Sequence, residues 1–146
     1  MDKRINVGQL EPNAYKALMG IEEYLGTTPI NKTHKDLIKI RASQINGCAF
    51  CINMHTIDAK KHGETEQRIY LLNAWREVNN LYSEEERAIL ALTEEMTLIA
   101  QGGVSNETYQ KAALLFDAHY LAQLMIAIIA INAWNRMAIT THMQPS

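Results

Sequence analysis

Two cysteines and a histidine stand close together in the stretch NGCAFCINMH, residues 46–55. Cys48 and Cys51 are the only cysteines of the chain, and His55 follows four residues after the second. On an α-helix, at about 100° per residue, the three side chains fall within about 60° of one another. Such a cysteine pair can cycle between dithiol and disulfide, and a neighbouring imidazole can accept a thiol proton. The spacing therefore predicts a redox-active dithiol on one helix face.

Each cysteine has its own physical reason to ionise. If Asn46 caps the helix, Cys48 lies in the first turn, where the positive end of the helix dipole lowers the pKa of a thiol. Cys51 lies one turn before His55, within direct reach of the imidazole. A neighbouring histidine lowers a thiol pKa more than a partly exposed helix end does. We therefore expect Cys51 to be the attacking cysteine.

Asp36 is a candidate partner for the histidine. If the chain reverses at residues 46–47, Asp36 lies ten residues before the turn and His55 eight after it. At about 1.5 Å per residue, the two would sit at similar height on antiparallel helices. A carboxylate there would orient the imidazole and stabilise its charged form. The alternative is that Asp36 only caps its helix, because Thr33 precedes it in capping-box spacing.

Two other interpretations of the cysteines stay open. Cysteine is among the most often buried residues, so the pair could be inert core. Zinc could bind the two thiolates and the imidazole, but the chain has no second C-x-x-C to supply a fourth ligand. No spacing nominates the remaining histidines as ligands, namely His34, His62, His119 and His142. We therefore expect neither a metal nor another cofactor.

The segments that position these residues are helical in pattern. Apolar residues recur at helical spacing, and no long stretch alternates apolar and polar residues. Ser83 and Glu86 stand in capping-box spacing at the start of one segment. The sequence predicts an all-α fold of about seven helices in a single domain over residues 1–146. These helices cover about 11–25, 33–45, 64–75, 83–103, 105–115 and 118–141, with a cysteine-bearing helix that ends at Lys61.

Charge and hydropathy limit the classes of partner. Fourteen basic and sixteen acidic side chains give a net charge of −2, which offers no electrostatic footprint for nucleic acid or an anionic membrane. The N-terminal stretch lacks the apolar core of a secretory signal, so we expect a cytoplasmic protein. The longest apolar run, 121–134, is interrupted by Gln123 and Asn132 and falls short of the ~18–20 residues that span a bilayer.

The stretch DLIKIRASQINGCAFCINMH (36–55) resembles the core signature of alkylhydroperoxidase D-like proteins, within the carboxymuconolactone decarboxylase superfamily. The signature runs acid, eleven residues, Cys, two residues, Cys, three residues, His. The similarity extends through HGETEQRIYLLNAWRE (62–77) to AINAWNRMAI (130–139). It implies an all-helical fold, reduction of hydroperoxides, and assembly into homotrimers or homohexamers. An external dithiol reductant, lipoyl or thioredoxin-like, is also implied.

Carried onto this chain, the resemblance makes Cys51 the peroxide-attacking cysteine and Cys48 the resolving one. His55 and Asp36 resemble the proton-relay pair. The family usually has Glu where this chain has Asp36, one methylene shorter, so a water could bridge the carboxylate and the imidazole.

Two rival functions follow from the same sequence. The decarboxylase branch of the superfamily suggests a lyase, but that branch does not use a cysteine pair, so the dithiol argues against it. The other rival is a non-catalytic helical oligomer with inert thiols, which alkylating reagents would leave unmodified at neutral pH. An oligomer is expected on either view, because the helix 118–141 is apolar around most of its circumference and should lie at the centre of the fold or in a subunit contact.

Overall fold

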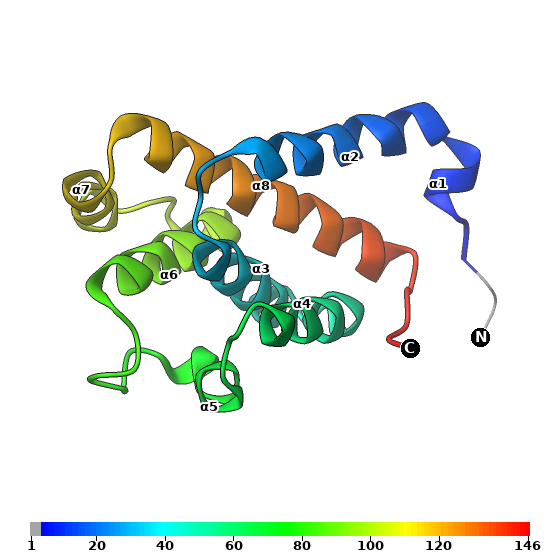
Figure 1. Cartoon of the computed structure of the whole chain (residues 1–146). Helices are drawn as coiled ribbons and strands as arrows, with labels where there is room; N and C mark the ends of the chain where they lie inside the picture. The colour runs from blue at the N-terminus through cyan, green and yellow to red at the C-terminus, as the bar shows by residue number, and fades with distance from the viewer. Residues whose placement is uncertain (1–3) are drawn as a thin grey trace.

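The computed structural model describes residues 4–146, and the secondary structure of this part of the chain is entirely helical. The all-α prediction is therefore confirmed. The described residues form eight α-helices (Figure 1) and two short 3-10 helices, η1 (Leu72–Ala74) and η2 (Ile99–Gln101). The α-helices are α1 (Val7–Leu10), α2 (Pro12–Thr27), α3 (Lys32–Asn46), α4 (Ala49–Lys61), α5 (Glu66–Tyr70), α6 (Glu84–Thr97), α7 (Asn106–Leu115) and α8 (Ala118–Thr140).

Local signals set the ends of these helices. Pro12 occupies the first turn of α2, where its missing N–H has no partner to lose. The capping box at the start of α6 is present, with the Ser83 hydroxyl and the Glu86 carboxylate each accepting from the other's backbone N–H. Two expected helices are shorter than predicted, because 64–75 divides into α5 and η1, and 83–103 into α6 and η2.

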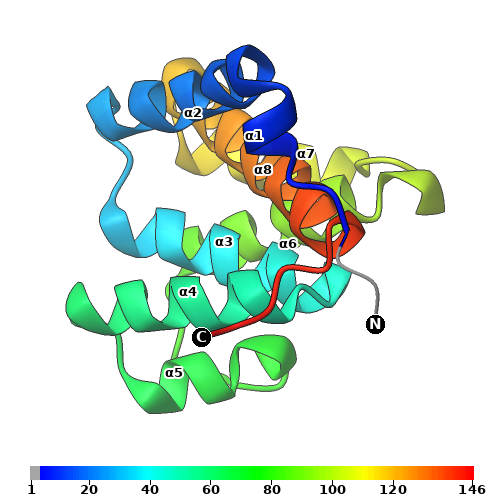
Figure 2. The same ribbon diagram turned by 90° about the vertical axis from the view of Figure 1, so that its right-hand side faces the viewer.

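Helix α8 forms the centre of the fold. It runs diagonally between α2 on one side and α3 and α6 on the other (Figure 1). Eight of its residues are buried, and most of them join a core cluster with side chains of α3 and α6. The expected central position is confirmed. A smaller core cluster, which includes Trp75 and Tyr82, packs α3, α4 and α5 together on the far side of α3 (Figure 2).

Helix α8 also corrects the expectation about membrane spans. Among residues 4–146 it is the one helix that is long and apolar enough, by length and composition alone, to cross a bilayer. The interrupting Gln123 and Asn132 do not shorten the helix, which continues to Thr140. Core helices of ordinary domains pass the same test, and α8 packs against α2, α3 and α6.

Candidate redox-active site

A tight turn joins α3 to α4 and delivers the first cysteine. Gly47 ends α3 in the left-handed conformation, with φ 71°, and its N–H bonds to the carbonyls of Ser43 and Gln44. Glycine adopts this conformation without the clash that a Cβ would cause. The next N–H, that of Cys48, also donates to the Ser43 carbonyl, at 3.0 Å. Cys48 is therefore fixed by the end of α3 before α4 begins.

The two cysteines lie together at the N-terminus of α4. They are joined by a disulfide with their Cα atoms 5.3 Å apart, and each is only 2% exposed. Cys48 is the N-cap of α4, and its sulfur accepts a hydrogen bond from the Cys51 N–H at 3.3 Å. Around them pack Ala138 of α8 and the partly buried Phe50. The two sulfurs of the predicted redox couple are therefore bonded to each other, and the reversibility of that bond stays a prediction.

Asn46 does not cap the helix as predicted. It is the last residue of α3, and its amide nitrogen donates to the side-chain oxygens of Asn132 and Asn135 on α8. Cys48 is the N-cap instead, so it directly precedes the first turn of α4 and does not lie within it. Its sulfur therefore accepts from a backbone N–H that has no carbonyl partner within the helix, at a position where a thiolate is stabilised.

His55 lies one turn after Cys51 and is partly buried. Burial is the main reason that the pKa of this imidazole falls from 6.5 to about 4; the nearby Lys39 acts in the same direction, and Glu22 and Asp58 act in the opposite direction. Lys39 and Glu22 are themselves an ion pair, at 3.3 Å. His55 is consequently neutral at pH 7.

Asp36 is not paired with His55. Its carboxylate, 7% exposed, accepts a hydrogen bond from Nδ1 of His62 at 2.7 Å. Burial raises the pKa of Asp36, and the contact with His62 opposes that shift. The predicted relay pair was therefore misplaced by seven residues along α4, which is two helical turns. The capping alternative is also wrong, because Asn31 is the N-cap of α3 and accepts from the Thr33 N–H.

His62 is the residue that sequence reasoning missed. It follows His55 by seven residues and is the C-cap of α4, directly after Lys61. With Asp36 it lines a pocket of about 190 Å³, to which α2 contributes Glu22 and α3 contributes Lys32, Lys35 and Lys39. The i, i+7 spacing from His55 was the available signal.

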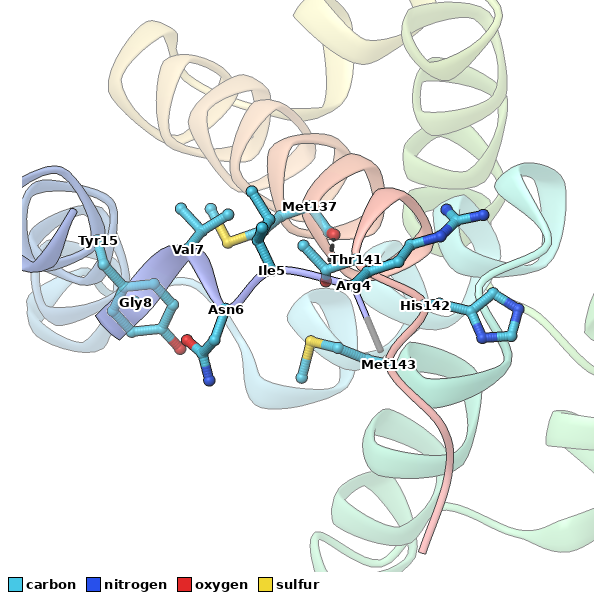
Figure 3. A pocket seen from close by; sticks show the side chains of 10 residues that line it. All are labelled: Arg4, Ile5, Asn6, Val7, Gly8, Tyr15, Met137, Thr141, His142 and Met143. Atoms are coloured by element: carbon cyan, nitrogen blue, oxygen red, sulfur yellow. Dashed lines mark hydrogen bonds between the residues drawn. The ribbon is translucent and has the colours of Figure 1, made fainter. Parts of the chain in front are cut away.

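A larger pocket of about 700 Å³ lies where the two ends of the chain meet. Figure 3 shows its lining side chains, which come from residues 4–8, from Tyr15 of α2, and from the C-terminal end of α8 with the residues after it. None of the four predicted site residues lines it. One of its lining residues, Met137, directly precedes Ala138, which packs against the cysteines.

Within 4–146, no group of three or more His, Cys, Asp and Glu side chains is placed to hold a metal ion. The sulfurs of Cys48 and Cys51 are bonded to each other, and His62 uses Nδ1 for Asp36. The arrangement suits two-electron thiol chemistry, with a neutral imidazole one turn from one of the sulfurs.

Two proteins are similar to this chain along nearly its whole length. An uncharacterized protein of Bacillus subtilis (strain 168), YdfG, is 47% identical over 139 residues, which cover 95% of this chain and 94% of its own. The crystal structure of a protein of unknown function from Agrobacterium tumefaciens, ATU0492, superimposes with a TM-score of 0.94. It is 37% identical over 99% of both chains, and a role as the antioxidant defence protein AhpD has been suggested for it.

A more distant structure has the same fold. An uncharacterized peroxidase-related protein from Ralstonia eutropha JMP134, described as an alkylhydroperoxidase AhpD core, gives a TM-score of 0.81 at 15% identity. The match covers 96% of this chain and 74% of that one. The model of the carboxymuconolactone decarboxylase family matches residues 12–95, which include α2, both cysteines and most of α6. The chain therefore belongs to the carboxymuconolactone decarboxylase family, as an alkylhydroperoxidase D-like member.

Proposed function

We propose that this protein is a thiol-dependent peroxidase that reduces hydroperoxides through Cys48 and Cys51, in antioxidant defence. The observation that carries the proposal is the disulfide at the N-terminus of α4, one turn before a neutral imidazole. A structural staple gains little from closing a loop of two intervening residues, because the stabilisation by a disulfide grows with loop length. Bridging at this spacing is better suited to a bond that opens and closes.

In the first step, the Cys51 thiolate attacks one oxygen of the peroxide and the O–O bond breaks. Cys51 is oxidised to a sulfenic acid, and the peroxide is reduced to an alcohol. His55 takes the Cys51 proton and returns it to the departing oxygen. Because the pKa of His55 is lowered to about 4, the imidazole is a weak base and its imidazolium a strong acid, so the proton passes from sulfur to the departing oxygen while the O–O bond breaks.

In the second step, the Cys48 thiol attacks the Cys51 sulfur, water leaves, and the disulfide closes. An external dithiol then attacks the bridge, is oxidised to its own disulfide, and restores both thiols. Departure of Cys48 as a thiolate is favoured by its N-cap position, because the Cys51 N–H donates to its sulfur. The overall reaction converts hydroperoxide and dithiol to alcohol, water and disulfide.

The proposal also covers the reductant, the cellular location and the assembly of the protein. The reductant is a lipoyl or thioredoxin-like dithiol, the protein is cytoplasmic, and it acts as a homotrimer or homohexamer. Asp36 is assigned to the His62 contact, so that His55 acts without a directly bonded carboxylate.

The test is peroxide consumption with a panel of dithiol reductants. Wild type should turn over with at least one of them, and both Cys51→Ser and Cys48→Ser should not. His55→Ala should turn over slowly, while His119→Ala, which removes an exposed histidine of α8, should match wild type. Turnover by Cys51→Ser at the wild-type rate would contradict the proposal, as would a wild-type protein that consumes no peroxide with any reductant.

A further inference from the structure

A cluster of buried amide and hydroxyl groups lies between α3 and α8, beside the cysteines. Its centre is Asn135, which is fully buried. Its amide nitrogen donates to the Ser43 hydroxyl at 3.0 Å, and its amide oxygen accepts from the Asn46 amide nitrogen at 2.9 Å. Asn135 therefore holds two residues of the last turn of α3 at once.

Both of these residues lie at the turn that delivers Cys48. The Ser43 carbonyl accepts from the N–H groups of Gly47 and Cys48, and Asn46 immediately precedes Gly47. One turn further along α8, Ala138 packs directly against the two cysteines. The same helix thus contacts the turn through hydrogen bonds and the sulfurs through van der Waals packing.

Packing alone does not explain an asparagine at this position. A buried amide loses its hydration on folding, and an apolar side chain of similar volume often serves stability as well. A fully satisfied polar network instead fixes one geometry, because its hydrogen bonds are directional. The geometry fixed here is that of the Ser43–Cys48 turn.

We propose that Asn135 is a positioning residue for the Cys48–Cys51 couple. Through Ser43 and Asn46 it holds the α3–α4 turn so that the Cys48 sulfur sits at the N-terminus of α4, against the Cys51 N–H. This inference rests on the redox role in the proposed function. It adds a residue, far away in the sequence, that shifts the equilibrium between the disulfide and the dithiol.

The direction of the effect follows from the charge on sulfur. Reduction adds two electrons and two protons to the disulfide, and the Cys48 thiol that forms can lose its proton. The Cys51 N–H stabilises the Cys48 thiolate more than it stabilises a neutral disulfide sulfur, because the bond to an ionised acceptor is stronger. Holding the N-cap geometry therefore favours the reduced form, and loosening it makes the bridge harder to reduce.

The experiment measures the equilibrium between the disulfide and dithiothreitol in wild type and in Asn135→Leu. Ser43 and Asn46 each keep a hydrogen-bond partner in this variant, because the Ser43 hydroxyl still donates to the Lys39 carbonyl and the Asn46 amide still donates to Asn132. Loss of an N-cap contact changes an equilibrium by about fivefold. The exchange constant should shift by about fivefold toward the disulfide, equivalent to about 20 mV for a two-electron couple.

Thr93→Val is the matched control. Thr93 is also fully buried and its hydroxyl donates to the Ile89 carbonyl, but it lies on α6 and has no hydrogen bond to the turn. Its exchange constant should equal that of wild type even if it unfolds in less urea. If the exchange constant only followed stability, both variants would shift it. If Asn135 positions the cysteines, only Asn135→Leu shifts it.

If Asn135→Leu does not fold, Asn46→Ala carries the test, because it breaks the same contact at a partly exposed residue. Its constant must shift in the same direction. An exchange constant within a factor of two of wild type, in whichever variant is measured, would overturn the positioning role of Asn135 and leave the proposed function standing. A wild-type bridge that dithiothreitol cannot open would overturn the proposed function as well.

Discussion

His55→Gln tests whether the histidine beside the cysteines is held neutral. Burial lowers the pKa of His55 from 6.5 to about 4 in the folded protein. Between those two values the unfolded chain binds a proton that the folded chain does not, so stability is complete above pH 6.5 and falls as the pH drops toward 4. Integrating this difference gives a loss of about 2 kcal/mol between pH 7 and pH 5. His55→Gln should lack that part of the acid sensitivity.

The assay is urea unfolding of the oxidised protein, followed by circular dichroism at pH 7 and pH 5. Protein concentration is held constant, because an oligomer's apparent stability depends on it. Other groups contribute to the wild-type slope: burial lowers the pKa of His34, which adds to the loss, and raises that of Asp36, which opposes it. These groups remain in His55→Gln, so the difference between the two proteins isolates His55.

His119→Gln, at an exposed position of α8, is the control and should keep the wild-type pH dependence. The refuting result is a wild type and a His55→Gln variant that lose the same free energy of unfolding between pH 7 and pH 5. In that case His55 titrates alike in the folded and unfolded chains, and the argument that burial keeps its imidazole neutral is wrong.

Three further outcomes are expected. Asp36→Asn should leave the rate of the first oxidation within about threefold of wild type, because Asp36 bonds to His62 and not to His55; a loss as large as that of His55→Ala, measured by stopped flow, would restore Asp36 to the relay. Mild peroxide treatment of the reduced protein should remove two hydrogens within one chain, measured by intact mass spectrometry, and a stable sulfenic or sulfinic acid without a bridge would argue against a resolving Cys48. Light scattering at micromolar concentration should give a mass well above the 16.5 kDa of one chain, and a monomer would contradict the proposed assembly.

The helical fold was predictable because its signals are local. Apolar periodicity, Pro12, the Ser83 capping box and Gly47 each act within one or two turns, and the structure has the helix ends close to where these residues place them. The sequence missed α1, which has only four residues and no buried side chain to give it a pattern. The splitting of two expected helices depends on tertiary packing, which periodicity alone does not report.

The cysteine pair was predictable for the same reason, since Cys48, Cys51 and His55 share a single helix. The Asp36 assignment failed because it required the register between two helices. Counting residues from the turn assumed that α3 and α4 run side by side at equal rise, and it placed Asp36 opposite His55. In the structure Asp36 meets His62, two turns further on. A register depends on how side chains pack across the interface, and hydrophobic pattern specifies it poorly for polar residues.

The network around Asn135 could not be predicted at all. Ser43 and Asn135 are separated by 92 residues, and an asparagine in an apolar helix gives no indication of its partner. The sequence indicated only that the helix 118–141 would be central. Its polar residues acquire a role once α3 and α8 are placed against each other.

Which sulfur meets the peroxide is decided by one single-turnover experiment. Reduced Cys48→Ser and reduced Cys51→Ser are each mixed with one equivalent of hydroperoxide and a sulfenic-acid trapping reagent, and the adduct is counted by mass spectrometry. Cys48→Ser should acquire one adduct, at Cys51, because His55 lies one turn away to accept its proton. Cys51→Ser should acquire none on the same timescale. An adduct on Cys51→Ser formed as fast as on Cys48→Ser would contradict this assignment and show that the N-cap position of Cys48 activates a thiol more strongly than His55 does.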